Sequence, residues 1–363
     1  MSSNKTFKDK VMAVLKNQLF IPLAALLILV LFNLIADPSF FKIAYKANSD
    51  GFMVFSGYLI TILDNASELV ILAIGMTLVT AASGGQDISV GAVIAIAGSV
   101  VLRVLCGTDP RPETLQAPII VAFLVCCVVS MAFGAFNGIL VSYFKIQPMV
   151  ATLILFTAGR SIAAWINHNN LPIISEPSFG WFGNYIPHIP FPTPIFIAIV
   201  FIIITMLVLK YTNIGLYTQS VGINANSSRL NGINPQMIKF LTYVIMGLCV
   251  AIAGFIKVCR ISTINYSVVA KDIEMDAILA VALGGNALSG GKFNMWASIL
   301  GAFVIQFLTT TLFKFDVASE ALPAYKAIVV IILVVLSAPI VRQKMSELSK
   351  KLTSKKAAAV EAK

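Results

Sequence analysis

Charged residues are scarce in this chain and make up only 12% of its 363 residues. An ordinary soluble domain carries roughly 25%. Apolar residues make up 58% of the chain and gather in long runs that recur along its whole length. A soluble protein of this size could not bury so many apolar side chains, whereas a bilayer accepts them, because lipid is as apolar as leucine. The composition therefore predicts an all-α, polytopic transmembrane helix bundle.

Residues that commonly carry catalysis or bind metals are also few. The two histidines, His168 and His188, lie in one polar loop, and the five cysteines show no metal-ligand spacing. An odd cysteine count with mostly buried positions indicates no disulfide framework. We expect no metal site and no cofactor bound by this chain.

Motifs of nucleotide binding and catalysis are missing as well. The stretch that ends in Gly290, Gly291 and Lys292 fails as a phosphate loop, because Asn286 replaces the first glycine and Phe293 replaces Ser or Thr. No Ser-His-Asp grouping and no convincing pair of catalytic carboxylates is found. The sequence therefore argues against an enzyme.

The net charge is +10, which by itself would suit nucleic-acid binding. The basic residues instead gather in the two tails that flank the apolar runs, which is typical of cytoplasmic ends. We predict a cytoplasmic N-terminal tail (1–17), a membrane domain (18–341) and a basic cytoplasmic C-terminal tail (342–363). The first apolar run is longer than the core of a secretory signal, so we expect it to stay in the mature protein.

About ten segments satisfy the length criterion of ~20 apolar residues for a membrane span. With an even number of spans, both tails lie on the cytoplasmic side. The third and eighth segments border glycine-rich breaks, and such short or broken spans normally line a protein interior. The ten ranges are 18–36, 60–82, 88–105, 117–143, 147–166, 193–211, 240–257, 273–285, 294–313 and 323–341.

Two loops are long. Segment 167–192 is predicted on the outer side, and segment 212–238 on the cytoplasmic side, where Asn and Gly punctuate short helical pieces. A loop as long as 212–238 invites a functional interpretation, although a passive linker is the alternative.

Two segments of the chain are similar to each other in sequence. Residues 84–91 (GGQDISVG, the first glycine turn) resemble residues 284–291 (GGNALSGG, the second glycine turn), and each precedes a predicted span. Transporters often contain internal repeats with glycine-interrupted helices beside the path. Coincidence in a glycine-rich membrane protein is the other explanation.

Asp87 is the most informative single residue, since a charge deep in lipid costs roughly 3 kcal/mol or more. It either lines a path or caps the following helix, and the two roles are compatible. Asp64, Asn65 and Glu68 form a polar stripe that indicates an outward vestibule or, equally simply, a surface turn. Arg160 lies within a span without an acidic neighbour in sequence.

Mixed charges lie near the predicted outer end of the eighth span. They suit the docking of a soluble partner or form an ordinary solvated edge. The residues of this predicted outer docking rim are Lys257, Arg260, Lys271 and Glu274.

Several stretches, in order from about residue 65 to 341, resemble the ribose/galactose-type permeases of ATP-binding-cassette importers. The residues that carry the resemblance are 72–79 (LAIGMTLV), 84–91, 136–141 (FNGILV), 145–153 (KIQPMVATL), 159–160 (GR) and 276–281 (DAILAV) before Gly284 and Gly285. Within that family the likeness is greatest to galactofuranose-importer permeases.

This resemblance implies an importer in the bacterial cytoplasmic (inner) membrane. The expected partners are a cytoplasmic ATPase that uses ATP and Mg, an external sugar-binding protein, and a second permease, identical or related. Segment 212–238 would be the coupling loop that docks into the ATPase, with Gly222, Asn224, Arg229 and Gly232 as coupling residues. Residues expected at the translocation path or its gate are Gln86, Asp87, Ser89, Asn137, Gln147, Asn286 and Ser289.

The chain departs from the family pattern at three places. Gln86 stands where an aliphatic residue is usual, Asn226-Ser227-Ser228 replaces a charged residue and two alanines, and Asp64 and Glu68 are extra. The change at residues 226–228 could tune the pairing with the ATPase, and the other departures could change which sugar passes.

Two rival functions follow from the spans. An ion-coupled secondary transporter would need intramembrane carboxylates that change charge, whereas here the carboxylates crowd at predicted span ends. A membrane scaffold would leave the two glycine turns and the long cytoplasmic loop unexplained.

Overall fold

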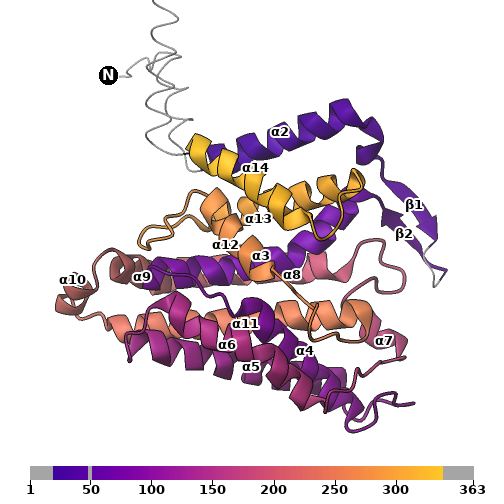
Figure 1. Ribbon diagram of the computed structural model, residues 1–363, viewed down its shortest axis with the longest axis horizontal. Coiled ribbons are helices and arrows are strands. Elements are labelled where there is room, and N and C mark those ends of the chain that lie inside the picture. Colours follow the sequence, from indigo (N-terminus) through magenta and orange to yellow (C-terminus); the bar gives the residue numbers. More distant parts are fainter. Residues whose placement is uncertain (1–18, 48–50, 338–363) are drawn as a thin grey trace, which may run out of the picture.

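The computed structural model describes residues 19–47 and 51–337, and most of them are helical (Figure 1). A helix lies in each of the ten predicted ranges. These helices are α2 (Phe20–Ala36), α3 (Tyr58–Ser83), α4 (Val90–Cys106), α5 (Ile119–Ser142), α6 (Pro148–Ile166), α8 (Thr193–Tyr211), α11 (Pro235–Ile261), α12 (Ile273–Leu283), α13 (Met295–Lys314) and α14 (Leu322–Ser337). The shorter elements are η1 (Pro38–Phe41), β1 (Ala44–Ala47), β2 (Met53–Ser56), α7 (Pro177–Gly180), α9 (Ile214–Ile223) and α10 (Ala225–Leu230).

Six of these helices, α3, α5, α6, α8, α11 and α13, are long and apolar enough to cross a membrane. The helical membrane-bundle class is therefore confirmed, while the count of ten spans stays a prediction. The predicted tails, 1–17 and 342–363, lie outside the described residues.

Local sequence signals explain where the helices begin and end. Asn234 accepts hydrogen bonds from the backbone N–H groups of Gln236 and Met237, and Asn224 accepts one from Ser227, so each caps a helix start. Pro148 opens α6, where a missing N–H costs nothing. Gly84 ends α3 in the left-handed conformation, which glycine adopts without strain.

The bundle has two distinct ends (Figure 1). The hairpin end carries the antiparallel β1–β2 pair, α7 and the segments 107–118 and 167–192; Tyr185 donates a hydrogen bond to the carbonyl of Phe55 there. The α10 end carries α9, α10 and both glycine turns. Segment 212–238 forms two short helices, as its sequence predicted.

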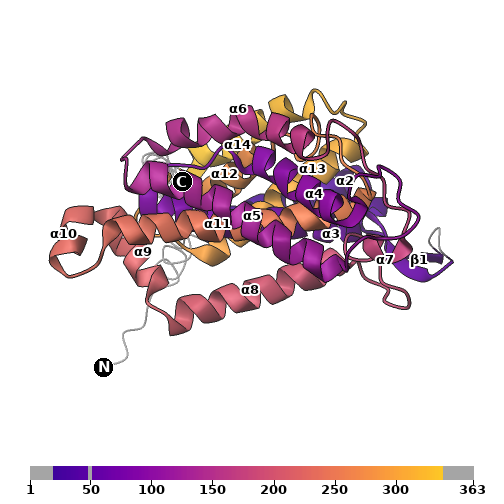
Figure 2. The same ribbon diagram turned by 90° about the horizontal axis from the view of Figure 1, so that it is seen from below.

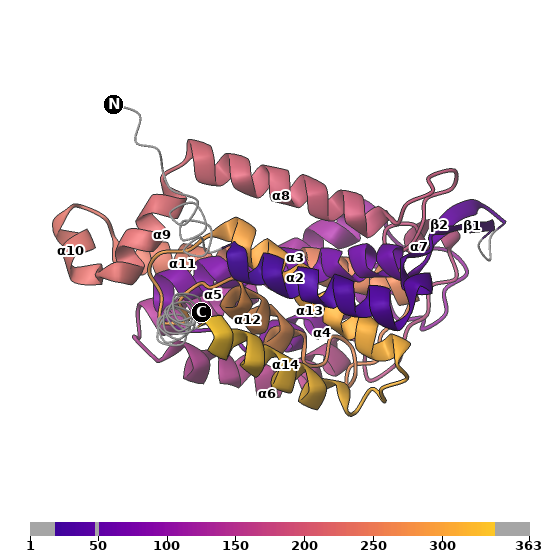
Figure 3. The same ribbon diagram turned by 90° about the horizontal axis from the view of Figure 1, so that it is seen from above.

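The centre of the bundle is built from α3 and α4, whose residues are mostly buried, and from α11, which packs against both. Figures 2 and 3 show α8 along one side of the bundle and α6 on the opposite side. The outward faces of α5 and α8 expose apolar side chains, Val128 and Ile203 among them, as lipid-facing helices do. α5 and α11 pack closely at Gly247, which has no Cβ. A Cβ at this position would lie only 2.5 Å from the carbonyl oxygen of Ser130.

Segment 262–272 returns from the hairpin end into the bundle before α12 starts. Arg160 of α6 donates hydrogen bonds to the carbonyl oxygens of Tyr266 (2.7 Å) and Val269 (2.9 Å). This pairing satisfies a membrane-embedded arginine that has no acidic neighbour in sequence. Glu274, in the first turn of α12, lies against Gly91 in the first turn of α4, so both helices begin inside the bundle.

Candidate functional site

The first glycine turn brings three of the predicted path residues together. The backbone N–H and the hydroxyl of Ser89 both donate to Asp87 Oδ1, at 2.9 and 2.6 Å, and Asn137 Nδ2 of α5 donates to Ser89 Oγ at 2.9 Å. All three residues are buried. The carboxylate bonds to Ser89, the residue before α4, and it also stabilises the turn that leads into this helix.

A small cavity of about 10 Å³ adjoins this cluster and is lined by Asp87, Ser89, Asn137 and glycines of α5 and α11. Asn137 Oδ1 is buried without a hydrogen-bond partner among the described residues. A cavity of this size holds about one water molecule. The cluster is therefore closed to any solute larger than a water molecule in this conformation.

The two glycine turns pack against each other at the α10 end. Gln86 Nε2 donates to the carbonyl of Leu288 (3.0 Å), and the N–H of Gly291 donates to the carbonyl of Ala81 (2.9 Å). Ser289 is exposed, and its carbonyl oxygen lies over Gly84. The two segments of similar sequence are thus in contact, while their origin as an internal repeat stays a prediction.

Asn286 serves a different contact from the other predicted path residues. Its Nδ2 donates to Ser298 Oγ (2.7 Å), and its Oδ1 accepts the N–H of Asn294 (2.7 Å). Thr77 of α3 donates to the same Ser298 hydroxyl at 2.7 Å. Asn286 therefore ties the second glycine turn to α13 and, through Ser298, to α3. Sequence inspection did not single out Thr77 or Ser298, because the pair forms only when α3 meets α13.

The predicted coupling residues lie on or beside α9 and α10. A Cβ on Gly222 would overlap the carbonyl of Ala81 and lie 2.6 Å from the Gly291 nitrogen, so α9 abuts both the end of α3 and the second glycine turn. Arg229 is exposed on α10. Gly232, which follows α10, is also exposed; its φ is +80°, and a Cβ added there would meet no other atom. Leu230 at the end of α10 is 90% exposed.

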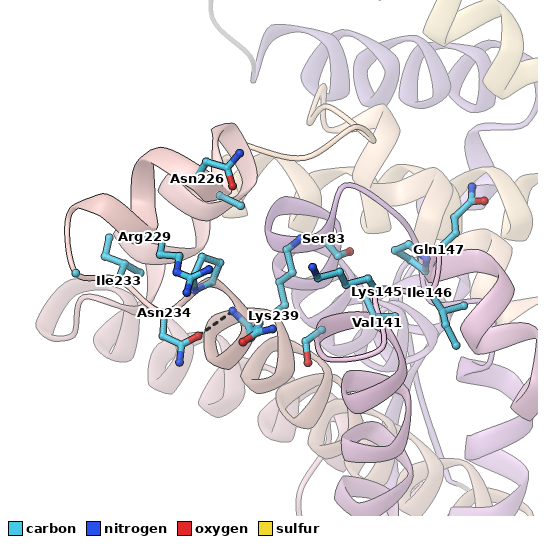
Figure 4. Close-up of a pocket in the computed structure, with 16 residues that line it drawn as sticks. Ser83, Val141, Lys145, Ile146, Gln147, Asn226, Arg229, Ile233, Asn234 and Lys239 are labelled. Atoms are coloured by element: carbon cyan, nitrogen blue, oxygen red, sulfur yellow. Dashed lines mark hydrogen bonds between the residues drawn. The ribbon is translucent and has the colours of Figure 1, made fainter.

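A cleft of about 630 Å³ separates α10 from the turn between α5 and α6 (Figure 4). Gln147, predicted at the path, lines this cleft rather than the Asp87 cluster. Lys145, Arg229 and Lys239 line it as well, and no carboxylate does. Sequence inspection missed Lys145 and Lys239. The signal that could have found them is the scarcity of acidic residues, since Glu176 is the one Asp or Glu between Glu113 and Asp272.

Charges at the hairpin end are paired inside the bundle. Lys257 Nζ lies 2.8 Å from Glu68 Oε2, and Arg260 Nη2 lies 3.0 Å from Asp64 Oδ1 and 3.2 Å from Glu68 Oε1. Arg260 also donates to Asn65 Oδ1. All three stripe residues belong to α3, so the surface-turn alternative is wrong.

The four predicted rim residues are dispersed. Lys271 is exposed, Lys257 and Arg260 engage the acids of α3, and Glu274 is 2% exposed within the bundle. Glu274 is buried because segment 262–272 returns inward before α12 begins. A role of these residues in docking stays a prediction.

A further ion pair ties α2 to α13 at the hairpin end. Asp37 Oδ2 lies 3.0 Å from Lys314 Nζ, and Asp37 Oδ1 accepts the N–H of Ser39. The hydrogen bonds from Ser39 and Lys314 lower the pKa of Asp37 to about 2. Among the described residues, no group of three His, Cys, Asp or Glu could hold a metal ion.

Comparison with known proteins places this arrangement in a family. Residues 58–338 match the family described as "Branched-chain amino acid transport system / permease component". The chain is 38% identical over 309 residues to the galactofuranose transporter permease protein YtfT of Escherichia coli (strain K12), covering 85% of this chain and 86% of the relative. No solved structure matches.

Two other relatives are similar over most of their length. The fructose import permease protein FruF of Bifidobacterium longum (strain NCC 2705) is 34% identical over 346 residues, 94% of this chain and 92% of that one. The ribose import permease protein RbsC of Escherichia coli (strain K12) is 32% identical over 317 residues, 86% of this chain and 91% of that one. The chain belongs to the permease-component family, and with six helices of membrane-spanning length among its described residues it is a multi-pass membrane protein.

Proposed function

We propose that this chain is the permease subunit of an ATP-binding-cassette importer for a monosaccharide, through which a sugar delivered by an external binding protein crosses the bacterial inner membrane. The family membership supports the transport role. The printed names of three relatives, for galactofuranose, fructose and ribose, support a small sugar as cargo. Galactofuranose is the preferred candidate, because the relative named for it has the highest identity of the three.

The observation that carries the coupling part of the proposal is the contact of Gly222 with Ala81 and Gly291. A partner ATPase that moves α10 would move α9, and α9 presses on the end of α3 and on the second glycine turn. Through the Gln86 hydrogen bond, the motion would reach the first glycine turn with Asp87 and Ser89. Binding and hydrolysis of ATP with Mg belong to that partner chain.

The Asp87 cluster is the proposed inner gate. Its hydrogen bonds join the start of α4 to α5, and the adjoining cavity is far too small for a sugar. Opening would separate Ser89 from Asn137 and expose hydroxyl, amide and carboxylate groups to the sugar. Such groups exchange hydrogen bonds with sugar hydroxyls without holding them tightly, which suits a low-affinity passage.

We further propose ten spans with the α10 end in the cytoplasm and both termini on that side. Described cations at this end are Lys145, Lys210, Arg229, Lys239 and Lys292, whereas Asp87 is buried. An excess of Lys and Arg is typical of cytoplasmic loops. The hairpin end would then face the external binding protein.

An ion-coupled transporter is a weaker candidate. It needs carboxylates that are free to change charge within the membrane. Glu68 and Asp276 are instead paired with Lys257 and Lys326, the latter pair at 2.7 Å. Asp87 is bonded to Ser89, which leaves Glu274 as the buried carboxylate that such a mechanism would have to use.

The first test is purification of the tagged chain in mild detergent, followed by mass spectrometry of the proteins that copurify with it. A stoichiometric ATPase with a phosphate loop supports the importer. If no ATPase is found and transport responds to an ion gradient, the importer proposal is wrong.

The coupling role is tested by Arg229→Ala and Gly232→Val in the reconstituted importer. We expect ATP hydrolysis without sugar transport, with the protein folded in the membrane. Ser227→Ala, on the same helix, is the matched control and should transport normally. Normal transport by both variants would contradict the coupling assignment.

A further inference from the structure

The cations that line the cleft beside α10 have no counterion in the described parts of the chain. The five ion pairs found there join other residues, and none includes Lys145, Arg229 or Lys239. The three come from separate elements: the turn between α5 and α6, α10, and the first turns of α11. Figure 4 shows Lys145 and Arg229 reaching into the space between α10 and this turn. Three converging positive groups without an acid favour an anionic occupant.

The surroundings of the cleft place it at the depth of lipid headgroups. Tyr143 and Phe144, directly before Lys145, are 49% and 69% exposed at the end of α5. Aromatic side chains at span ends are typical of the membrane–water interface. Exposed apolar residues of α6, Met149 and Val150, continue from the cleft toward the lipid. An ATPase would meet the exposed tip of α10 at Leu230 first.

We propose that this cleft binds the phosphate headgroup of one anionic phospholipid, whose acyl chains run along α5 and α6. Basic pockets between transmembrane helices are known sites for anionic headgroups. The lipid would join the α5–α6 turn to α10 and so hold the proposed coupling segment against the bundle. Pro148, in the same cleft, packs on Gly85, which connects the headgroup site to the first glycine turn.

The direct test is native mass spectrometry of the purified chain with equal amounts of phosphatidylglycerol and phosphatidylethanolamine. We expect one retained phosphatidylglycerol per chain. Each cation near a headgroup contributes enough that its loss weakens retention by about fivefold, so Lys145→Gln with Lys239→Gln should weaken it by about 25-fold. Lys210→Gln with Lys292→Gln, at the same end but outside the cleft, is the matched control and should retain the lipid.

A second measurement uses the unchanged protein and does not depend on whether the variants fold. Amine acetylation should be slower at Lys145 and Lys239 in phosphatidylglycerol nanodiscs than in phosphatidylcholine nanodiscs, with Lys292 unaffected.

Equal retention of both lipids, or equal acetylation in both nanodiscs, would overturn the proposal. Displacement of the lipid by inorganic phosphate would make the cleft a site for free anions. Protection that requires added ATPase instead of anionic lipid would assign it to the partner. Neither readout involves sugar transport, so failure here leaves the proposed function standing.

Discussion

The two ends of the bundle solve the problem of membrane-embedded charge in opposite ways. At the hairpin end, Lys257 and Arg260 of α11 meet Asp64 and Glu68 of α3 inside the protein. At the α10 end, Lys145 and Lys239 line an open cleft without an acid. The hairpin end is thus joined by ion pairs of its own residues, whereas the cations of the cleft have no ion pair among the described residues, and we propose that an anion from outside the chain neutralises them.

The two glycine turns at the α10 end meet without an ion pair among the described residues. The α10 end holds its two glycine turns together through backbone contacts and few side-chain bonds, Gln86 to Leu288 among them. Such contacts resist insertion of a side chain but separate without breaking an ion pair. An end built in this way can move during a transport cycle, while the paired end stays assembled.

The largest expected effect comes from breaking the charge cluster at the hairpin end. Glu68→Gln leaves Lys257 and Arg260 short of a counterion, and removal of one partner of a buried pair costs about 3–5 kcal/mol of stability. Denaturation in detergent measures the loss. Lys239→Met at the α10 end should cost no more than about 1 kcal/mol, because it has no ion pair to lose. Equal losses of stability for both variants would contradict the proposed difference in charge pairing between the two ends.

The next effect concerns the contact of α9 with α3. Gly222→Ala places a methyl group on the carbonyl of Ala81, and such overpacking costs about 1–3 kcal/mol. Because α9 must shift, we expect sugar transport to fall far more than ATP hydrolysis. Ser220→Ala, also on α9, is the control. Wild-type transport by Gly222→Ala would show that α9 is not pressed against α3 during the cycle.

A smaller effect is expected at the proposed gate. Asn137→Ala removes the donor to Ser89 Oγ, which costs about 0.5–1.5 kcal/mol, the usual net worth of one hydrogen bond. Sugar leakage through the importer should rise in liposomes without ATP, since the start of α4 loses its tie to α5. Thr157→Ala, exposed on α6, provides the matched comparison. Unchanged leakage would argue against a gate at this cluster.

The smallest effect is a pH dependence at the hairpin end. The folded pKa of Asp37 is about 2, below its ordinary value of 3.8. A lowered carboxyl pKa contributes stability above the ordinary value, and this contribution is lost as pH falls toward 2. The difference in unfolding temperature between wild type and Asp37→Asn should be constant above pH 5 and shrink between pH 4 and 2. A difference that persists at pH 2 would contradict the pKa assignment.

Much of the helix layout could be predicted from the sequence. The predicted range 193–211 coincides with α8, and most other boundaries differ by one or two residues. Within the described residues α11 is the exception, since it begins five residues earlier and ends four later than predicted. The predicted end of the last span, 338–341, lies outside the described residues. The apolar criterion stopped near Lys239 and Lys257. α11 continues because Asn234 caps its start and Glu68 pairs with Lys257 near its far end.

The candidate site was predicted only in part. Asp87, Ser89 and Asn137 meet as a cluster, whereas Asn286 and Gln147 lie elsewhere. Side chains on different helices come together according to helix rotation and tilt, and no sequence period reports either. Glu274 was misplaced for a related reason, because nothing local indicates that segment 262–272 returns into the bundle.

The sequence by itself determined the membrane class, the glycine turns and the excess of cations, because these depend on composition and on the length of apolar runs. Only the tertiary structure decided which charges are paired. Glu68 and Lys257 are far apart in the chain and meet because α3 packs on α11, whereas Lys145 and Lys239 line a cleft that no acid reaches. The difference between the two ends is a property of helix packing, since a charge is neutralised only by a partner within a few ångströms.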